Sequence, residues 1–369
     1  MKKTGAWLIR FALEQIGVKH TFGIPGVHNT ETYDELNRSD QVQPILVTHE
    51  GGAAFMADAI SRTSKDIGTL LIVPAAGVTH AASGIGEAFL DGVPMLVISG
   101  GIHTESGKSY QLHDVDQHAL LAPITKRTYK VETHEDIIPA IYEAYQIAMR
   151  DEPGPVFVEV PVNIQLFPGE VAETPPFVVG EADRELDWKS IKHAAQLLYA
   201  AKKPALFIGW GAVDASISTA RIAEFLQAPV ATTLQGLSAF PGNHPLHTGM
   251  SFGQAAVPAA ENAFRDCDCM LAVGTRFSEI ATASYGVNPP ENLIHVDINA
   301  KVFNANYPAA VTIEGDAGDV LAALFEMLQS LGPPKPDNAE LKSGIEKDTC
   351  CQSLSGLVTQ IMLSWSESG

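Results

Sequence analysis

Short apolar runs rich in β-branched residues alternate with helical patterns along most of the chain. In the first half, the predicted strands cover residues 20–24, 44–48, 69–74, 95–99 and 156–160. Helical periodicity covers residues 7–16, 51–64, 81–90 and 137–150. Strands and helices that alternate at this spacing form a parallel sheet with helices on both faces. The pattern therefore predicts a doubly wound α/β domain.

A second alternating region follows a polar stretch punctuated by prolines. Its predicted strands cover residues 205–209, 229–232, 270–274, 293–298 and 311–314, and a helix over residues 318–331 closes it. We therefore expect two doubly wound parallel-sheet domains, residues 1–170 and residues 188–333, joined by a linker at 171–187. The second is expected to be a central, Rossmann-like α/β domain.

Residues 334–369 form an atypical tail with no strand pattern. Apolar residues at helical spacing predict a short amphipathic helix, made of Leu354, Leu357, Val358, Ile361, Met362 and Trp365. The simpler interpretation is a helix docked on its own domain, and the alternative is a helix for a partner's groove.

Composition narrows the classes of function. Hydrophobic residues make up 46% of the 369 residues and charged residues 18%, which is typical of a well-packed globular protein. The net charge of −19 and the lack of a basic cluster argue against nucleic-acid binding. No apolar run reaches membrane-spanning length and no signal-peptide core develops, so a cytoplasmic protein is expected. The four cysteines lack zinc-type spacing, and no metal ligands are predicted.

Glu50 is the ionisable residue with the most informative setting. It follows the apolar run 44–48, which predicts a short buried parallel strand, and it precedes Gly51 and Gly52, which open a helix. Open α/β sheets bind ligands at the carboxyl ends of their strands. A carboxylate buried there needs a hydrogen-bonding partner. Glu50 is therefore a candidate ligand-binding residue, and the alternative is that it caps the helix beginning at Gly51.

Other segments at strand ends could converge on the same cleft. Pro25 and Gly26 form a turn after the first strand, and the turn with Gly77 and Thr79 follows the third. Gly100 follows the fourth strand, and a polar loop covers residues 111–117. Each turn alone is weak support, because glycines after strands mostly serve backbone geometry. Their order along the chain is more specific.

That order resembles the N-terminal, pyrimidine-binding domain of thiamine diphosphate enzymes of the acetolactate synthase and 2-oxo acid decarboxylase group. The matching stretches are residues 22–26, 49–57, 77–91, 93–100, 123–126 and 154–156. The resemblance continues through the central domain, at residues 203–204, 209–211, 232–236, 240–241, 244–246, 249, 274–277 and 295–298. The combination is highly specific, although each motif alone is not.

The resemblance implies roles for the cleft residues. In this family the glutamate matching Glu50 hydrogen-bonds the pyrimidine nitrogen N1′ of thiamine diphosphate and favours the imino form that removes the thiazolium proton. Pro25, Gly26, Gly77 and Thr79 would shape the aminopyrimidine pocket. Gln111 would lie near the reacting centre, and a solvated polar loop is the alternative.

Two histidines near these turns receive no catalytic role at this stage. His28 and His80 are each isolated in the sequence, and imidazoles in such positions can act in proton transfer. More often they only satisfy local hydrogen bonds. We therefore expect both side chains to bond locally.

The central domain offers a second ligand hypothesis. In synthase-like members the stretch matching residues 274–277 binds the diphosphate of FAD, and Arg276 would be the anion contact. Many relatives bind an ADP-like ligand or nothing there, and Arg276 paired with a local acid is the alternative.

The resemblance places Mg²⁺ and the cofactor diphosphate on a third domain that carries a Gly-Asp-Gly run, and these 369 residues contain no such run. We therefore expect a subunit or fragment of a carboligase or decarboxylase that acts on pyruvate-like 2-oxo acids and holds half of the site. Its expected partners are further copies, as a homodimer or tetramer, or a separate subunit that carries the diphosphate-binding domain. The alternatives are an inactive truncated product or interaction module, and a nucleotide-binding protein without this activity.

Overall fold

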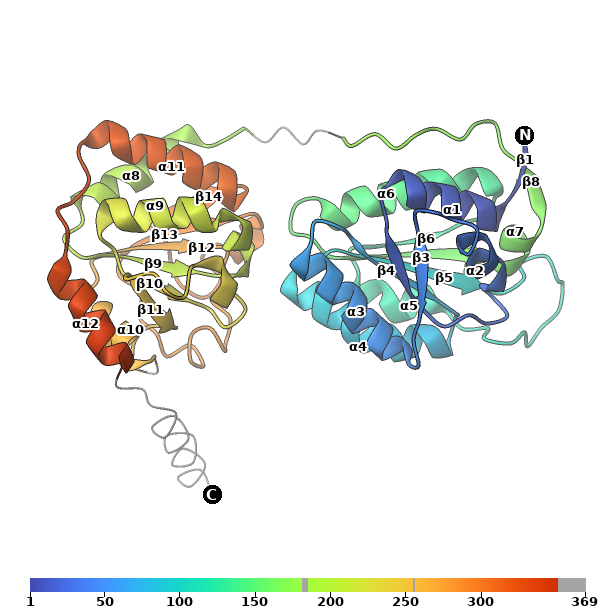
Figure 1. The fold of residues 1–369 in the computed structure, drawn as a ribbon, viewed down its shortest axis with the longest axis horizontal. Coiled ribbons are helices and arrows are strands. Elements are labelled where there is room, and N and C mark those ends of the chain that lie inside the picture. The colour runs from blue at the N-terminus through green and yellow to red at the C-terminus, as the bar shows by residue number, and fades with distance from the viewer. Residues whose placement is uncertain (181–184, 255, 351–369) are drawn as a thin grey trace, which may run out of the picture. The chain divides into compact units, whose positions relative to one another are not determined.

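The structure is a computed structural model that describes residues 1–180, 185–254 and 256–350. The chain divides into two compact units, Met1–Ala182 and Asp183–Gly369. Each unit contains its own six-stranded parallel sheet (Figure 1). The predicted fold class, two doubly wound parallel-sheet domains, is therefore confirmed.

The sheet of the first unit has the strand order β3-β2-β4-β5-β7-β6. Its strands are β2 (His20–Gly23), β3 (Gln43–Leu46), β4 (Gly68–Ile72), β5 (Met95–Gly101), β6 (Arg127–Lys130) and β7 (Pro155–Pro161). All neighbours pair in parallel, so the carboxyl ends of all six strands lie along one edge. A separate antiparallel pair joins β1 (Lys2–Thr4) to β8 (Pro168–Glu170).

Helices cover both faces of this sheet. They are α1 (Gly5–Gln15), α2 (Thr30–Leu36), α3 (Glu50–Thr63), α4 (Ala76–Asp91), α5 (Gln117–Leu121), α6 (Ile137–Met149) and α7 (Val162–Leu166). In Figure 1, α1 and α6 lie on one face and α3 and α4 on the other. Alternate strand residues such as Leu96, Ile98 and Val156 are fully buried under the α1–α6 side. Continuous apolar runs of this kind are typical of strands buried on both faces.

The second unit repeats the architecture with the strand order β11-β10-β9-β12-β13-β14. Its strands are β9 (Pro204–Ile208), β10 (Val230–Thr232), β11 (His247–Met250), β12 (Cys269–Val273), β13 (Asn292–Asp297) and β14 (Val311–Glu314). Its helices are α8 (Trp188–Ala200), α9 (Ser216–Leu226), α10 (Pro258–Ala263), α11 (Ala317–Leu331) and α12 (Ala339–Cys350).

Two cores sandwich this second sheet. Leu206, Ile208 and Leu271 belong to a core shared with α8, α9 and α11. Phe207 and Ala272 point to the opposite face, where they join a smaller core with aromatic residues. Among the described helices of the whole chain, none is both long enough and apolar enough to cross a membrane.

Three details differ from the sequence-based expectations. The strand before Glu50 is parallel, but it is the edge strand β3, which pairs only with β2, so its residues are half-buried or exposed rather than buried. Helix α4 begins at Ala76 rather than at residue 81, so Gly77 and Thr79 belong to its first turn and not to a loop. Residues 168–170, inside the first predicted domain, form β8 and pair with β1, and neither of these short strands was predicted.

The tail is only partly described. Its first half contains α12, which the sequence analysis did not predict and which contacts α10. Lys335 donates its backbone N–H to the carbonyl of Phe225 at 2.9 Å, so the segment leading to α12 is attached to the second unit. The amphipathic helix expected between Leu354 and Trp365 lies outside the described residues.

Candidate functional site

Glu50 is the first residue of α3, and it is not the cap of that helix. The N-cap is His49, whose Nδ1 accepts a hydrogen bond from the backbone N–H of Gly51 at 3.0 Å. A side-chain acceptor at this position satisfies one of the free N–H groups of the first turn. The hydrogen-bonding cap is therefore His49 and not Glu50, whose carboxylate lies in the first turn of the helix and faces other groups.

The Glu50 carboxylate is largely buried and hydrogen-bonds to a histidine. Only 10% of its side chain is exposed, and its Oε2 lies 3.1 Å from Nδ1 of His80 on α4. Because a carboxylate only accepts, the hydrogen of this bond is on His80 Nδ1. The His80 ring also stacks on His49, with ring centroids 4.9 Å apart. The contact joins α3 to α4 beside the carboxyl edge of the sheet.

Tyr33 of α2 also lies within electrostatic reach of Glu50. The pKa of Tyr33 is raised, first by burial and then by the negative charge of Glu50. Its hydroxyl donates to the backbone carbonyl of Leu71 at 2.9 Å, which anchors the phenol on β4. A neutral phenol therefore forms part of the wall near the carboxylate.

Gly77 leaves space next to the other carboxylate oxygen. A Cβ built on Gly77 would lie 3.7 Å from Oε1 of Glu50 and 3.0 Å from Cγ2 of Val73. The preceding Ala75 has a φ of +55°, which is a strained conformation for a residue with a side chain. Such strain is often found where the backbone is shaped around a ligand. The turn after β4 thus brings backbone rather than side chain toward Glu50.

The turn after β2 is packed against the turn after β4. A Cβ on Gly26 would meet Cγ1 of Val73 at 2.7 Å, so a larger residue would push the two turns apart. The N–H of Gly26 donates to Oδ1 of Asn29 at 2.7 Å, which closes the turn. Pro25 is exposed in this turn. Gly26, Gly77 and Glu50 are therefore brought to one edge of the sheet.

Thr79 and Gln111 have local partners. The exposed hydroxyl of Thr79 donates to the carbonyl of Ala76 at 3.1 Å, within the first turn of α4. Gln111 donates from Nε2 to the carbonyl of His103 at 3.0 Å, within the loop that follows β5. The structure thus places Gln111 on the loop that follows β5, with its amide bonded to that loop.

Arg276 lies in the second unit and is exposed in the turn after β12. Two strand-end turns touch there, because a Cβ on Gly209 would lie 2.1 Å from the carbonyl oxygen of Gly274 and one on Gly211 would lie 2.8 Å from its Cα. Only glycines permit this approach. The turn is closely packed against a second strand-end turn, and it belongs to a different unit from Glu50.

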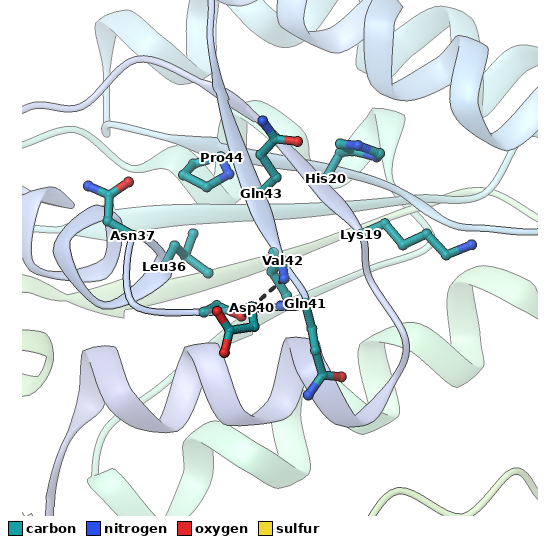
Figure 2. A pocket seen from close by; sticks show the side chains of 10 residues that line it. Lys19, His20, Leu36, Asn37, Asp40, Gln41, Val42, Gln43 and Pro44 are labelled. Carbon is teal, nitrogen blue, oxygen red and sulfur yellow. Dashed lines mark hydrogen bonds between the residues drawn. The ribbon is translucent and has the colours of Figure 1, made fainter.

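The hollow shown in Figure 2 lies at the opposite edge of the first sheet. It is lined by Lys19 and His20 at the start of β2 and by Gln43 and Pro44 at the start of β3. The loop after α2, including Ser39, completes it. Because the strands are parallel, these amino-terminal ends are separated from Glu50 by the length of the strands. The hollow is not part of the Glu50 site.

Three neighbours of Glu50 were missed as functional residues in the sequence. His49 was named only as part of a matching stretch, Tyr33 was not considered, and His80 was expected only to bond locally. No pattern in the sequence pairs Glu50 with His80, because they are 30 residues apart and on different helices. Their contact depends on how α3 packs on α4.

The arrangement is a buried carboxylate, held by an imidazole and facing a space lined by glycines. Such a group can share a proton with a ring nitrogen of a ligand. Because this carboxylate lies at the carboxyl edge of a doubly wound sheet, the protein belongs to the class of α/β proteins that bind a ligand at the strand ends. Family comparison supports this class and narrows it.

Two family models match the chain, one on each unit. Residues 3–120 match the N-terminal TPP binding domain of thiamine pyrophosphate enzymes, and residues 191–324 match the central domain of the same enzymes. The chain therefore belongs to the thiamine pyrophosphate enzyme family, and the resemblance predicted from its motifs is confirmed.

Curated relatives agree with this assignment. The chain is 31% identical over 349 residues to the acetolactate synthase isozyme 1 large subunit of Escherichia coli, covering 94% of this chain and 62% of that protein. It is 34% identical over 341 residues to a probable acetolactate synthase large subunit of Methanocaldococcus jannaschii, covering 89% and 56%. It is 35% identical over 333 residues to a probable 2-ketoarginine decarboxylase of Pseudomonas aeruginosa, covering 88% and 58%. The chain thus spans between 56% and 62% of the length of these relatives.

Proposed function

We propose that the chain is the pyrimidine-binding and central part of a thiamine diphosphate-dependent carboligase or decarboxylase that acts on pyruvate-like 2-oxo acids. The observation that carries the proposal is the buried Glu50 carboxylate at the carboxyl edge of a domain of this family. The names of the relatives support the 2-oxo acid class, since they are acetolactate synthases and a decarboxylase of 2-ketoarginine.

The residues at the site fit the aminopyrimidine of the cofactor. Glu50 offers a largely buried oxygen acceptor, and the glycine positions 26 and 77 keep side chains out of the space beside it. When bound, thiamine diphosphate supplies an electron sink for breaking the bond next to the carbonyl of a 2-oxo acid.

The residues of this chain would position the cofactor's pyrimidine and exclude water from the site. Glu50 would hold a proton between its carboxylate and the pyrimidine nitrogen, and His80 would keep that carboxylate in one orientation. Tyr33 would exclude water from the buried side, because its hydroxyl is already bonded to Leu71. In a dry site these interactions are stronger than they are in water. Gly26, Gly77, Pro25 and Thr79 would form the backbone wall of the pocket.

The remaining parts of the cofactor need other residues. The diphosphate and its Mg²⁺ would be held by residues outside the two matched domains, on a longer form of this chain or on another subunit. The turn at residues 274–277, with Arg276, is the proposed contact for the diphosphate of FAD if a flavin binds.

We also propose that the protein forms a homodimer or tetramer through the helix that begins at Glu50. Phe55 and Met56 are about half exposed on α3, at 49% and 48%. Large apolar side chains exposed together beside a functional site are typical of an interface. An analytical ultracentrifugation run would test this, and a monomer at micromolar concentration would contradict it.

The activity is tested by supplying the chain, in its longest native form, with thiamine diphosphate, Mg²⁺ and pyruvate. The proposal expects CO₂ release that requires both the cofactor and Glu50. Equal CO₂ release by a Glu50→Ala variant would contradict the proposal.

A further inference from the structure

His28 and His113, called here the second imidazole pair, lie in contact at the carboxyl edge of the first sheet. His28 follows β2, and His113 lies in the loop between β5 and α5. Their ring centroids are 5.3 Å apart, with an angle of 36° between the planes. The two rings come from segments far apart in the sequence, so it is the fold that brings them together.

Both rings of the second imidazole pair have a buried nitrogen without a partner. Nδ1 of His28 and Nδ1 of His113 are inaccessible to solvent, and neither has a hydrogen-bond partner within the described part of the chain. Only 5% of His28 is exposed. A buried polar atom that lacks a partner is unfavourable by about 1–3 kcal/mol. Two such atoms on rings in contact favour one ligand that satisfies both.

The pair formed by His49 and His80 differs from the second imidazole pair in this respect. Nδ1 of His49 accepts from the N–H of Gly51, and Nδ1 of His80 is bonded to the carboxylate of Glu50. Those two rings stack with an angle of 23° between their planes. Contact between two imidazoles therefore does not by itself leave Nδ1 atoms without partners.

The backbone of His28 is held in place by two neighbouring segments. Its carbonyl accepts a hydrogen bond from Nε2 of Gln165 at 2.8 Å. A Cβ on Gly100 would lie 2.1 Å from the same carbonyl oxygen, so the turn after β2 presses against the end of β5. The ring is thus presented from a closely packed part of the fold.

The other nitrogen of His28 has the surroundings typical of a metal ligand. The pKa of His28 is lowered, first by burial and then by His113, so the ring is neutral near pH 7. A contact with the backbone of Leu112 acts in the opposite direction, as a carbonyl that accepts from a ring N–H does. Since Nδ1 has no partner, that N–H is on Nε2, and Nδ1 carries a lone pair. Metal-binding histidines usually donate their second nitrogen in this way.

His113 lies on an anchored loop that borders solvent. Its φ is +64°, a conformation that is uncommon for a residue with a side chain and often found at ligand sites. The loop is tied at its end by Gln117, whose Nε2 donates to the carbonyl of Gly100 at 3.0 Å. His113 is half-buried, and its neighbours Leu112 and Asp114 are exposed. An ion can therefore approach from the side of the loop.

The distance between the rings matches a metal ion shared by both. Zn²⁺ binds an imidazole nitrogen at about 2.0–2.1 Å, which places the ring centroid at about 3.2 Å from the ion. Two rings at a tetrahedral angle around one ion then have centroids about 5.2 Å apart. A water molecule that hydrogen-bonds to both nitrogens at the same angle would place them at about 6.4 Å. The observed separation of 5.3 Å agrees with the ion.

The ligand type selects the kind of metal. Imidazole nitrogen suits Zn²⁺, Cu²⁺ and Ni²⁺, whereas Mg²⁺ takes oxygen ligands. Among the described residues, no group of three or more histidine, cysteine, aspartate or glutamate side chains could hold a metal ion. The second imidazole pair would therefore supply two protein ligands, and water would complete the coordination. Such a site is more open than a structural zinc site, which has four protein ligands.

We propose that His28 and His113 bind a divalent transition-metal ion such as Zn²⁺ through both Nδ1 atoms. The ion would fasten the loop after β5 to the turn after β2, because one ligand comes from each. The inference rests on the geometry of the two rings and not on the proposed function. The sequence-based prediction of no metal ligands came from cysteine spacing, which cannot reveal two histidines that only the fold brings together.

The test is a titration of the full 369-residue chain, labelled with ¹⁵N in histidine, with Zn²⁺ and separately with Mg²⁺. Zn²⁺ is expected to shift the ring nitrogens of His28 and His113 together, with one dissociation constant for both rings. Mg²⁺ at the same concentrations should shift neither ring. No shift of the two rings with Zn²⁺, a shift of only one of them, or an equal effect of Mg²⁺ would overturn the proposal.

Variants test whether the two rings share one ion. In His28→Phe the remaining His113 ring should need at least about tenfold more Zn²⁺ to shift, and the same should hold for His28 in His113→Phe. His113 is only half-buried on a loop, so its variant keeps the test decisive if His28→Phe fails to fold. Unchanged Zn²⁺ affinity in either folded variant would contradict a shared ion. His193→Gln, on an exposed position of α8 in the other unit, is the matched control and should leave the affinity unchanged.

Discussion

At the scale of single residues, the pair formed by Glu50 and His80 links the fold to the proposed chemistry. Half of the His80 side chain is exposed, at 52%, whereas Glu50 is almost enclosed. An ion pair or hydrogen bond with one exposed partner contributes little to stability, typically below about 1 kcal/mol. The pair is therefore better explained by the orientation it gives to the carboxylate than by any stabilisation of the fold.

Replacing Glu50 by glutamine tests its proposed role. Gln keeps the size of the side chain but removes the carboxylate that is proposed to share a proton with the cofactor, so cofactor-dependent turnover should fall by roughly 10²–10⁴-fold. Turnover of pyruvate with saturating thiamine diphosphate measures this. Glu87→Gln, an exposed position on α4, is the matched control and should be near wild type.

Removing His80 tests whether it acts through Glu50. His80→Ala should weaken cofactor binding by roughly three- to tenfold and change the free energy of unfolding by less than about 0.5 kcal/mol. In the Glu50→Gln background the same substitution should have almost no further effect, because the carboxylate it orients is gone. Additive effects of the two substitutions on cofactor binding would show that His80 acts independently.

Sequence reasoning reached only one member of this pair. Glu50 could be singled out because a charged residue directly after an apolar run and before two glycines is locally unusual. His80 could not, because its role comes from a contact 30 residues away that requires α3 to pack on α4. The same holds for His28, whose orphaned Nδ1 depends on which backbone surrounds the ring.

At the scale of elements, the contact between α3 and α4 positions the site. Gly84 of α4 lies against α3, and a Cβ on it would be 2.6 Å from Cβ of Ala54. Small residues at a helix contact let two backbones approach closely. This close approach sets the distance between Glu50 on one helix and His80 on the other.

Gly84→Ala should therefore be destabilising although alanine favours helices. The added methyl group must push α3 and α4 apart, and overpacking of this kind is unfavourable by about 1–3 kcal/mol. Gly86→Ala on the same helix is the control, because the nearest atom to its Cβ would be 3.8 Å away, and it should stabilise by up to about 1 kcal/mol. Urea unfolding measures both, and equal midpoints for the two variants would contradict the packing argument.

Edge elements were predicted less well than central ones. The central strands β4, β5 and β7 are fully buried, so their continuous apolar runs could be recognised. The edge strand β6 reads Arg-Thr-Tyr-Lys and was missed, because a strand covered on one side only needs no such run. The apolar run 44–48 was correctly predicted to be a strand but wrongly predicted to be buried, because an edge strand can be apolar and still be partly exposed.

At the scale of the whole molecule, the two units have separate cores, and the stability of the second unit depends on histidines whose rings are neutral in the fold. In the second unit, burial lowers the pKa of His247 and that of His295 below the ordinary value of 6.5. His295 is bonded through Nε2 to the carbonyl of Thr275 at 2.8 Å, and its Nδ1 is buried without a partner in the described residues. Protonation of either ring is thus unfavourable in the fold.

Acidification should therefore destabilise the second unit. Below pH 6.5 the unfolded chain binds protons on these histidines while the folded unit does not. The free energy of unfolding therefore decreases as the pH is lowered, until the lowered pKa values are reached. His295→Phe should make the dependence between pH 7 and 5.5 shallower, whereas His193→Gln should not. A dependence as steep in His295→Phe as in the wild type would contradict this account.

The central claim is that this chain binds the pyrimidine of thiamine diphosphate at Glu50. The most direct measurement is a titration of the ¹⁵N-histidine-labelled chain with thiamine diphosphate, observed at the ring nitrogens of His80. The account predicts a saturable shift of His80 that is lost in Glu50→Gln. Resonances of the second unit that shift while His80 stays unchanged would place the cofactor elsewhere and contradict the claim.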